Sequence, residues 1–353
     1  MNTPDLVGAA GLVTEDEPDI YLPDRLWQVS FHQSIATPRY INWWTRSALY
    51  RDQVKVACAG TSSSMQNLDQ DSFRSFVVPW LSVSEQILIA NFLEDKTARI
   101  DALIAEKERL LNVLKQQHFD AIDHAVLGGE TSEGGPRLRG LEVLGALPEG
   151  WACSRMKFEI DYLTSGSRGW ADFYSDTGAL FVRIGNLTRD SLGLDLSDIQ
   201  RVELPASAEG QRARVRPGDL LISITAYLGS VAVVSEDIEE AYVSQHVSLA
   251  RPNSLRAVPK WLGYIVLSSI GRTFFELQAY GGTKVQLSLE DIRELPIPLP
   301  SKAVQDARIS NLEEKLSRLG ELTAHVEGHL VRLREYRLSL ISAAVTGQLH
   351  LNR

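Results

Sequence analysis

The chain has 353 residues, a length that allows two or three domains of ordinary size. Its 44% hydrophobic content suits a globular core, and no apolar run approaches the ~20 residues that cross a bilayer. The formal net charge of −9 argues at first against a nucleic-acid binder. Two cysteines are too few for a disulfide framework, and the N-terminus lacks the pattern of a secretory signal, so we expect a cytoplasmic protein.

The first half of the chain is repeated in the second half. Residues 68–128 align without a gap with residues 287–347, at a constant offset of 219. Upstream of this run the match continues more weakly at an offset of 221. Residues 137–221 have no counterpart in the first half. The sequence therefore predicts one complete unit that is preceded by the back part of a second unit.

In chain order, residues 1–81 form the partial first unit, and residues 82–128 are predicted to be a long amphipathic helix. Residues 129–139, rich in Gly, Ser, Glu and Pro, predict a linker. Residues 140–300 predict a globule of short strands (179–184, 219–224 and 231–234) with a helix over 259–277. Residues 301–347 predict the second long helix, and residues 348–353 a tail. This mixture indicates an α+β fold.

Apolar residues recur along both long helices in steps of seven, three and four, as in the seam of a coiled coil. One interpretation is a single amphipathic helix lying on a domain. We prefer the pairing of the two helices as an antiparallel coiled coil, because the globule between them has to return the chain to its start. The predicted interface consists of Leu93, Ile100, Leu103, Leu110, Leu114, Leu312, Leu319, Leu322, Val326, Leu333 and Leu340.

No recognisable catalytic motif occurs in the sequence. There is no Gly-x-Gly-x-x-Gly loop, P-loop, His-Glu-x-x-His or Cys-x-x-Cys, and no Asp/Asn-Pro-Pro-Tyr/Phe tetrapeptide. A free-standing enzyme is therefore the least favoured interpretation, and we expect neither a cofactor nor a metal on this chain.

Several motifs of the second unit, taken in order, resemble one known family. They are Leu-Pro-Glu-Gly-Trp at 147–151, Val-Arg-Ile-Gly-Asn-Leu at 182–187, Pro-Gly-Asp-Leu-Leu at 217–221, Gly-Thr-Lys-Val-Gln at 282–286 and Arg-Glu-Tyr-Arg at 334–337. Each motif is weak alone, but their order, spacing and duplication resemble the specificity subunit of a type I restriction-modification system.

This resemblance implies two target recognition domains, each reading one half of a split DNA site. In the family two long helices space these domains and dock the methyltransferase subunits. The implied partners are double-stranded DNA, methyltransferase subunits and a restriction/translocase subunit. S-adenosylmethionine, ATP and Mg are then expected on the partner subunits. The chain itself would not be catalytic.

The sequence departs from the family pattern in its first domain, which lacks counterparts of residues 147–221. Recognition of one half-site is therefore in doubt. We expect a truncated gene, an upstream fragment that supplies the remainder, or a second copy of the chain that does so. An alternative function is a coiled-coil adaptor that no longer reads DNA.

The charge of the complete unit is nearly balanced, since residues 137–300 hold 17 basic and 20 acidic residues, and 14 of the basic residues are arginines. Arg212, Arg214 and Arg216 alternate and are predicted to form a basic face apart from the acidic run 236–240. Any single arginine can equally belong to an ordinary surface ion pair. The candidate DNA contacts are Arg168, Arg183, Asn186, Arg189, Tyr227, Gln245, His246, Lys284 and Gln286.

Overall fold

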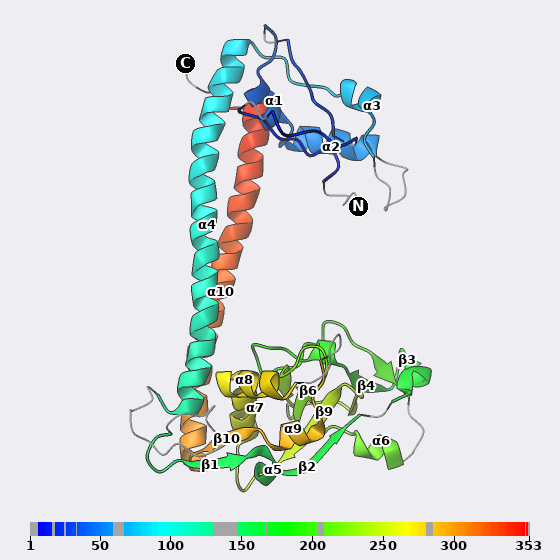
Figure 1. Cartoon of the computed structure of the whole chain (residues 1–353), viewed down its shortest axis with the longest axis vertical. Coiled ribbons are helices and arrows are strands. Elements are labelled where there is room, and N and C mark those ends of the chain that lie inside the picture. Colours follow the sequence, from blue (N-terminus) through cyan, green and yellow to red (C-terminus); the bar gives the residue numbers. More distant parts are fainter. Residues whose placement is uncertain are drawn as a thin grey trace. The chain divides into compact units, whose positions relative to one another are not determined.

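The structure is a computed structural model that describes residues 6–349 and 351 except 16–17, 25, 33, 59–66, 130–146, 167, 204–207 and 280–284 (Figure 1). The chain forms two compact units. Unit 1 consists of Met1–Asn112 with Thr323–Arg353, and unit 2 of Val113–Leu322. Most of the linker predicted over 129–139 lies outside the described residues. Each long helix contributes one part to each unit.

Unit 1 is built from helices. Its elements are α1 (Pro38–Trp44), α2 (Ala48–Ala57), α3 (Gln70–Arg74) and parts of α4 (Val83–Leu127) and α10 (Lys302–Val345). The side chains of Thr37 and Ser47 cap the N-termini of α1 and α2, where they accept backbone N–H groups. Aromatic residues of α1 and α2 pack with the long helices around the buried Leu93. No β-strand occurs in the described part of unit 1.

Unit 2 holds all the described strands. They are β1 (Ala152–Arg155), β2 (Ile160–Ser165), β3 (Tyr174–Ser175), β4 (Ala179–Val182), β5 (Arg201–Val202), β6 (Leu220–Ser223), β7 (Val231–Val233), β8 (Ala241–Val243), β9 (Val247–Pro252) and β10 (Pro296–Leu299). Its helices, besides the long ones, are α5 (Met156–Glu159), η3 (Trp170–Phe173), η4 (Ile184–Asn186), α6 (Ala208–Arg212), α7 (Pro259–Leu267), α8 (Ser269–Gln278) and α9 (Leu289–Arg293).

Two four-stranded sheets and a helical layer make up this unit (Figure 1). One sheet has the order β2-β9-β6-β7 and the other β3-β5-β4-β8, while β1 pairs with β10. Side chains of β6 alternate between the two faces of the first sheet. Leu220 and Ile222 pack into the core with α7 and α8, whereas Leu221 packs into the core shared with β4 and β8. The predicted α+β fold and the three predicted strands are confirmed.

The helix predicted over 259–277 is broken in two. Ser268 has extended backbone (φ −69°, ψ 172°) and separates α7 from α8. Its hydroxyl donates to the carbonyl of Ile265 at 2.7 Å, so the turn is satisfied internally. A Cβ on Gly271 would lie 2.3 Å from the carbonyl oxygen of Val266, so the start of α8 can approach the end of α7 only with glycine there. The apolar periodicity carries no signal for this break.

The long helices pair with each other and run antiparallel in both units. In unit 1, Arg334 of α10 pairs with Glu108 at 2.7 Å and Arg337 with Asp101 at 2.7 Å, so the numbering runs in opposite directions. In unit 2, the guanidinium of Arg308 donates to the carbonyls that end α4, including that of Gly128. The predicted coiled coil is confirmed, and the alternative of a single helix lying alone on a domain is wrong.

The predicted register of the seam is wrong at three positions. Leu93, Ile100, Leu114, Leu312, Leu319, Val326 and Leu340 are buried and Leu333 is half-buried, but Leu103, Leu110 and Leu322 are exposed. Steps of four and three alternate strictly along a seam. After Ile100 the seam therefore continues at Ile104, Lys107 and Leu111. The second helix follows the same rule and uses Thr323 in place of Leu322.

The repeat is also visible in the hydrogen bonds. Buried Gln86 accepts from the backbone N–H of Thr37 and donates to the carbonyl of Leu81. Its repeat partner Gln305 accepts from the N–H of Val258 at 2.9 Å and donates to the carbonyl of Pro300 at 2.9 Å. Each glutamine thus joins the start of a short helix to the start of a long helix. Among the described helices, none has the length and apolar character needed to cross a membrane.

Candidate nucleic-acid interface

The ends of four strands meet at one edge of unit 2, which we call the loop rim. It comprises the residues that follow β2, β4, β6 and β8, together with residues 285–287. The N–H of Ser244 donates to Val182 at 2.9 Å, and that of Ile224 donates to His246 at 3.1 Å. A bridge between Thr225 and Gln286 extends the rim. The rim therefore gathers six predicted contacts from separate loops: Arg168, Arg183, Tyr227, Gln245, His246 and Gln286.

Gly166 allows the loop after β2 to reach this edge. A Cβ at Gly166 would lie 1.9 Å from the carbonyl oxygen of Val243 at the end of β8. Only a residue without a side chain permits so close a backbone approach. Arg168, two residues further on, is exposed, and no ion pair holds it within the described chain. It is free to reach a ligand.

Two buried polar atoms of the rim lack partners. The Oγ of Ser244 and the Nε of Arg183 find no hydrogen-bond partner among the described residues. Both lie where β4 and β8 end side by side. Asp198 accepts from Nη2 of Arg183 at 2.8 Å, which orients the guanidinium but leaves Nε unused. Buried polar groups are normally paired, so these two atoms have hydrogen-bonding capacity left for water or a ligand. The sequence patterns did not indicate Ser244.

Asn186 is not a surface contact, which corrects the sequence prediction. Its side chain is buried, accepts from the N–H of Arg183 at 2.9 Å, and donates to the carbonyls of Asp195 and Asp198 at 2.8 and 2.9 Å. Both amide hydrogens and the oxygen are used, so little hydrogen-bonding capacity remains for a base. Asn186 instead holds the loop that presents Arg183.

Arg189 lies further along the loop that contains η4. Arg189 is exposed, and it forms no ion pair with any residue that the structure describes. The neighbouring Thr188 bridges to Val231 at the start of β7, which keeps this loop beside the rim. Lys284, another predicted contact, lies outside the described residues.

Tyr227 stands on a strained turn between β6 and β7. The preceding Ala226 has φ +60°, a left-handed conformation that costs a non-glycine residue energy. The carbonyl of Tyr227 accepts from both the N–H and the hydroxyl of Ser230, at 3.2 and 3.0 Å. The backbone is thus fixed while the ring projects into solvent.

Gln245 and His246 form a polar pair at the end of β8. The side-chain nitrogens Nε2 of the two residues lie 3.1 Å apart, and both side chains are half-buried. Gln286 is also half-buried and is held by its bridge to Thr225. These three side chains offer donors and acceptors of the kind that read base edges.

Most arginines of unit 2 are engaged in structural ion pairs. Those paired with a carboxylate are Arg155, Arg183, Arg201, Arg214, Arg251, Arg256, Arg293 and Arg318. The predicted basic face at 212–216 is wrong, because Arg212 ends helix α6 and Arg214 lies 3.9 Å from Glu240 in the acidic run. This mixed cluster lies at the edge opposite the loop rim, where β8 begins.

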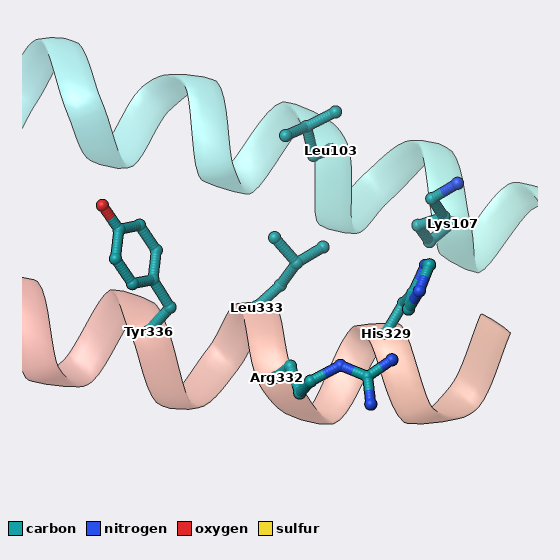
Figure 2. A pocket seen from close by; sticks show the side chains of 6 residues that line it. All are labelled: Leu103, Lys107, His329, Arg332, Leu333 and Tyr336. Atoms are coloured by element: carbon teal, nitrogen blue, oxygen red, sulfur yellow. The ribbon is translucent and has the colours of Figure 1, made fainter. Parts of the chain in front are cut away.

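A pocket of about 360 Å³ opens between the long helices in unit 1. Figure 2 shows Lys107 of α4 together with His329 and Arg332 of α10 around it, with Leu103, Leu333 and Tyr336 as apolar lining. Partial loss of hydration lowers the pKa of His329, and the nearby His325, Arg332 and Lys107 lower it further. The His325 and His329 rings lie 4.3 Å apart between centroids. The pocket wall is thus chiefly apolar, and Lys107, His329 and Arg332 are the basic residues that border it.

The comparisons with known proteins agree with this architecture. Residues 197–325 match the family model described as the type I restriction modification DNA specificity domain. The chain is 23% identical over 301 residues to the EcoBI specificity subunit of Escherichia coli, covering 82% of this chain and 62% of that protein. It is 25% identical to the EcoKI specificity subunit of Escherichia coli strain K12, covering 88% of this chain and 65% of that protein. The chain thus spans just under two thirds of these relatives' length.

Solved structures show the same fold. One, described as the structural basis of complex assembly and conformational transition of the type I R-M system, matches with a TM-score of 0.71 at 17% identity, covering 90% of this chain and 73% of that chain. The HsdS subunit from Thermoanaerobacter tengcongensis matches with a TM-score of 0.50 at 17% identity, covering 89% and 71%. Unit 2 and the helix pair thus have the fold of these structures. The chain is similar to the type I restriction-modification specificity subunits, so the resemblance seen in its sequence is confirmed.

Proposed function

We propose that unit 2 reads one half of a bipartite DNA site through the loop rim. The observation that carries this proposal is the pair of unpartnered buried atoms, Ser244 Oγ and Arg183 Nε, in a rim that also presents unpaired arginines. A base edge or a phosphate can satisfy such atoms directly or through water.

The rim residues divide into two roles. Arg168 and Arg189 are exposed cations without ion-pair partners in the described chain, so they contact phosphates and set the position of the duplex. Gln245, His246 and Gln286 contact base edges. Tyr227 lies with its ring free on a rigid turn, which suits stacking or packing against the DNA. Arg183, whose guanidinium is held by Asp198, can contact either a phosphate or a base edge.

The helix pair docks the methyltransferase subunits in this proposal. Leu110 and Leu322 are exposed apolar residues on the outside of the seam, and Leu103 lines the open pocket beside it, so a partner would cover them. The partner subunits carry S-adenosylmethionine, ATP and Mg, and this chain is not catalytic. The net charge of −9 leaves much of the phosphate neutralisation to the partners. The chain works in the cytoplasm, consistent with Cys58 and Cys153 not being joined in a disulfide.

The test measures duplex binding by the chain in complex with its methyltransferase subunit. The double variant Arg168→Ala/Arg189→Ala should weaken binding to all duplexes and lower the salt dependence by about one unit per lost phosphate contact. Gln245→Ala should reduce discrimination between sequences instead. Arg201→Ala, which breaks an ion pair with Glu239 at the opposite edge, is the matched control. Unchanged DNA binding in the double variant and in Gln245→Ala would leave only the adaptor function.

A further inference from the structure

The turn between β6 and β7 holds a large side chain out into solvent on a fixed backbone. Tyr227, at the tip of this turn, is 60% exposed. The next residue, Leu228, packs against the core of unit 2. The N–H of Gly229 donates to the carbonyl of Ser223 at 3.4 Å, which joins the turn to the end of β6. The ring therefore projects from a backbone that is held on both sides.

The repeat builds the same turn in unit 1. At the offset of 221, residues 6–9 correspond to residues 227–230. The third residue of each turn is a glycine with left-handed backbone, φ +71° at Gly8 and +75° at Gly229. In each turn the N–H of the fourth residue donates to the carbonyl of the first, at 3.0 Å in unit 1 and 3.2 Å in unit 2. The two copies thus share one backbone conformation here.

Each turn also rests on the same part of its unit. A Cβ at Gly8 would lie 2.8 Å from Cγ2 of Val54 on α2, and a Cβ at Gly229 would lie 3.4 Å from the ring of Phe275 on α8. Val54 and Phe275 are repeat partners at the offset of 221. The second residue of each turn packs against the core of its own unit. Only the first residue, at the tip, points away from the core.

Both tips carry a large apolar or aromatic side chain. Leu6 is 66% exposed at the position equivalent to Tyr227. Turns ordinarily favour Gly, Pro, Asn, Asp and Ser, so two such tips at one repeat position are unusual. In unit 2 the left-handed backbone of Ala226, with φ +60°, adds a conformational cost to presenting the ring. A ligand that covers the tip would account for both features.

The surroundings of the unit 2 tip favour DNA as that ligand. On one side, the bridge between Thr225 and Gln286 brings a hydrogen-bonding side chain next to the turn. On the other side, the N–H of Val231 donates to the carbonyl of Thr188 at 2.9 Å, so the loop with the exposed Arg189 lies beside it. Bases stack on aromatic rings, and phosphates bind cations. A ring flanked in this way matches a duplex better than an apolar protein surface.

We propose that Tyr227 is a wedge that enters the base stack of the half-site and kinks the duplex. The inference rests on the proposed function of the loop rim, since the wedge acts only on bound DNA. A side chain that enters a base step unstacks it and bends the duplex by ~20–90°, and leucine, the residue at the tip in unit 1, is among the side chains that do so. Pyrimidine–purine steps open most easily. The wedge therefore adds discrimination at a step that no side chain reads by hydrogen bonds.

The test uses the chain in complex with its methyltransferase subunit. The half-site is first identified from the sequences that the complex methylates in the cells that produce it. Duplexes then carry 2-aminopurine, whose fluorescence rises on unstacking, at one step at a time, and energy transfer between the duplex ends measures bending. We expect the natural chain to unstack one step and to bend the duplex by at least about 20°. Tyr227→Ala should lose both signals and bind the site about tenfold more weakly.

Three further variants separate a wedge from other roles of this tyrosine. Tyr227→Phe and Tyr227→Leu keep a large apolar side chain at the tip, so both should retain the unstacked step and the bend. Tyr174→Ala is the matched control, because Tyr174 is 46% exposed on β3 and pairs with Val202 beside the start of β4, at the edge opposite the loop rim. This control should leave unstacking, bending and affinity unchanged.

Three results would overturn the wedge. One is sequence-specific binding by the natural complex without any unstacked step. Another is loss of both signals in Tyr227→Phe, since the hydroxyl would then make the contact. The third is loss of the methyltransferase subunit from Tyr227→Ala, since the tip would then be a protein contact. Equal binding of the natural complex to all duplexes is a different result, because it would refute the proposed function of the loop rim and the wedge with it.

Discussion

The register of the helix seam can be tested by four leucine-to-alanine substitutions. Leu93 and its repeat partner Leu312 are buried in the seam, whereas Leu103 and its repeat partner Leu322 are exposed on the same helices. Truncating a buried leucine costs the transfer free energy of the lost atoms and leaves a cavity. We expect Leu93→Ala and Leu312→Ala each to lower the free energy of unfolding by about 3 kcal/mol.

The exposed pair provides matched controls. Leu103→Ala and Leu322→Ala remove the same atoms from half-exposed positions, so each should cost less than about 1 kcal/mol. With a urea dependence of about 2 kcal/mol per molar, the buried variants should shift the unfolding midpoint by ~1.5 M and the controls by ~0.5 M or less. Far-ultraviolet circular dichroism of the full chain measures these midpoints.

The comparison of Leu93 with Leu103 on α4 and that of Leu312 with Leu322 on α10 test the alternating four-three seam independently. If Leu103→Ala proves as costly as Leu93→Ala, and Leu322→Ala as costly as Leu312→Ala, the alternating four-three seam is incorrect. The heptad of leucines that the sequence pattern favours would then be the true contact line.

Three further substitutions probe separate features. Gln305→Leu leaves the N–H of Val258 and the carbonyl of Pro300 without partners, so it should lower the free energy of unfolding in urea by about 2–4 kcal/mol. The control Gln116→Leu changes an exposed glutamine and should leave that free energy almost unchanged. Because the pKa of His329 is lowered from 6.5, protonation opposes folding. Unit 1 should lose stability as pH falls below 6.5, and His329→Gln should flatten that dependence; an equally steep profile would exclude His329 as the cause. Gly166→Ala should distort the loop rim and weaken DNA binding, whereas Gly185→Ala, whose Cβ meets no atom within 4 Å, should not; equal binding would show that the loop tolerates the shift.

Much of the architecture could be predicted because the chain contains its own comparison. Identity at a constant offset indicates two copies of one structure, and two apolar stripes that need cover indicate a helix pair. The seam register was harder, because leucines occur on both sides of the contact line and apolar character alone does not separate Leu103 from Ile104. The two lie one position apart, and only packing decides which of them is buried.

The candidate site was predictable in composition but not in detail. Polar residues that follow predicted strands correctly indicated the loop rim, because the ends of neighbouring strands meet at one edge of unit 2. Burial was not predictable for Asn186, whose amide is used up by three backbone groups. Nor was the pairing of Arg214 with Glu240, which depends on a contact between segments distant in sequence. Ser244 gave no signal, since an unpaired hydroxyl is a property of the folded chain.

The hydrogen bonds at the starts of α2 and α8 bear on how the chain would respond to cleavage. The N–H of Ala48 donates to the hydroxyl of Ser342, and the N–H of Ser269 donates to the carboxylate of Asp123. Each short helix is thus hydrogen-bonded to the long helix of the other repeat. The core of unit 2 likewise contains Ile122 and Val126 from the first copy. Each unit therefore contains segments of both copies of the repeat. A protease that cuts between 130 and 146 should yield two pieces that remain associated, because each unit contains buried contacts between the two pieces.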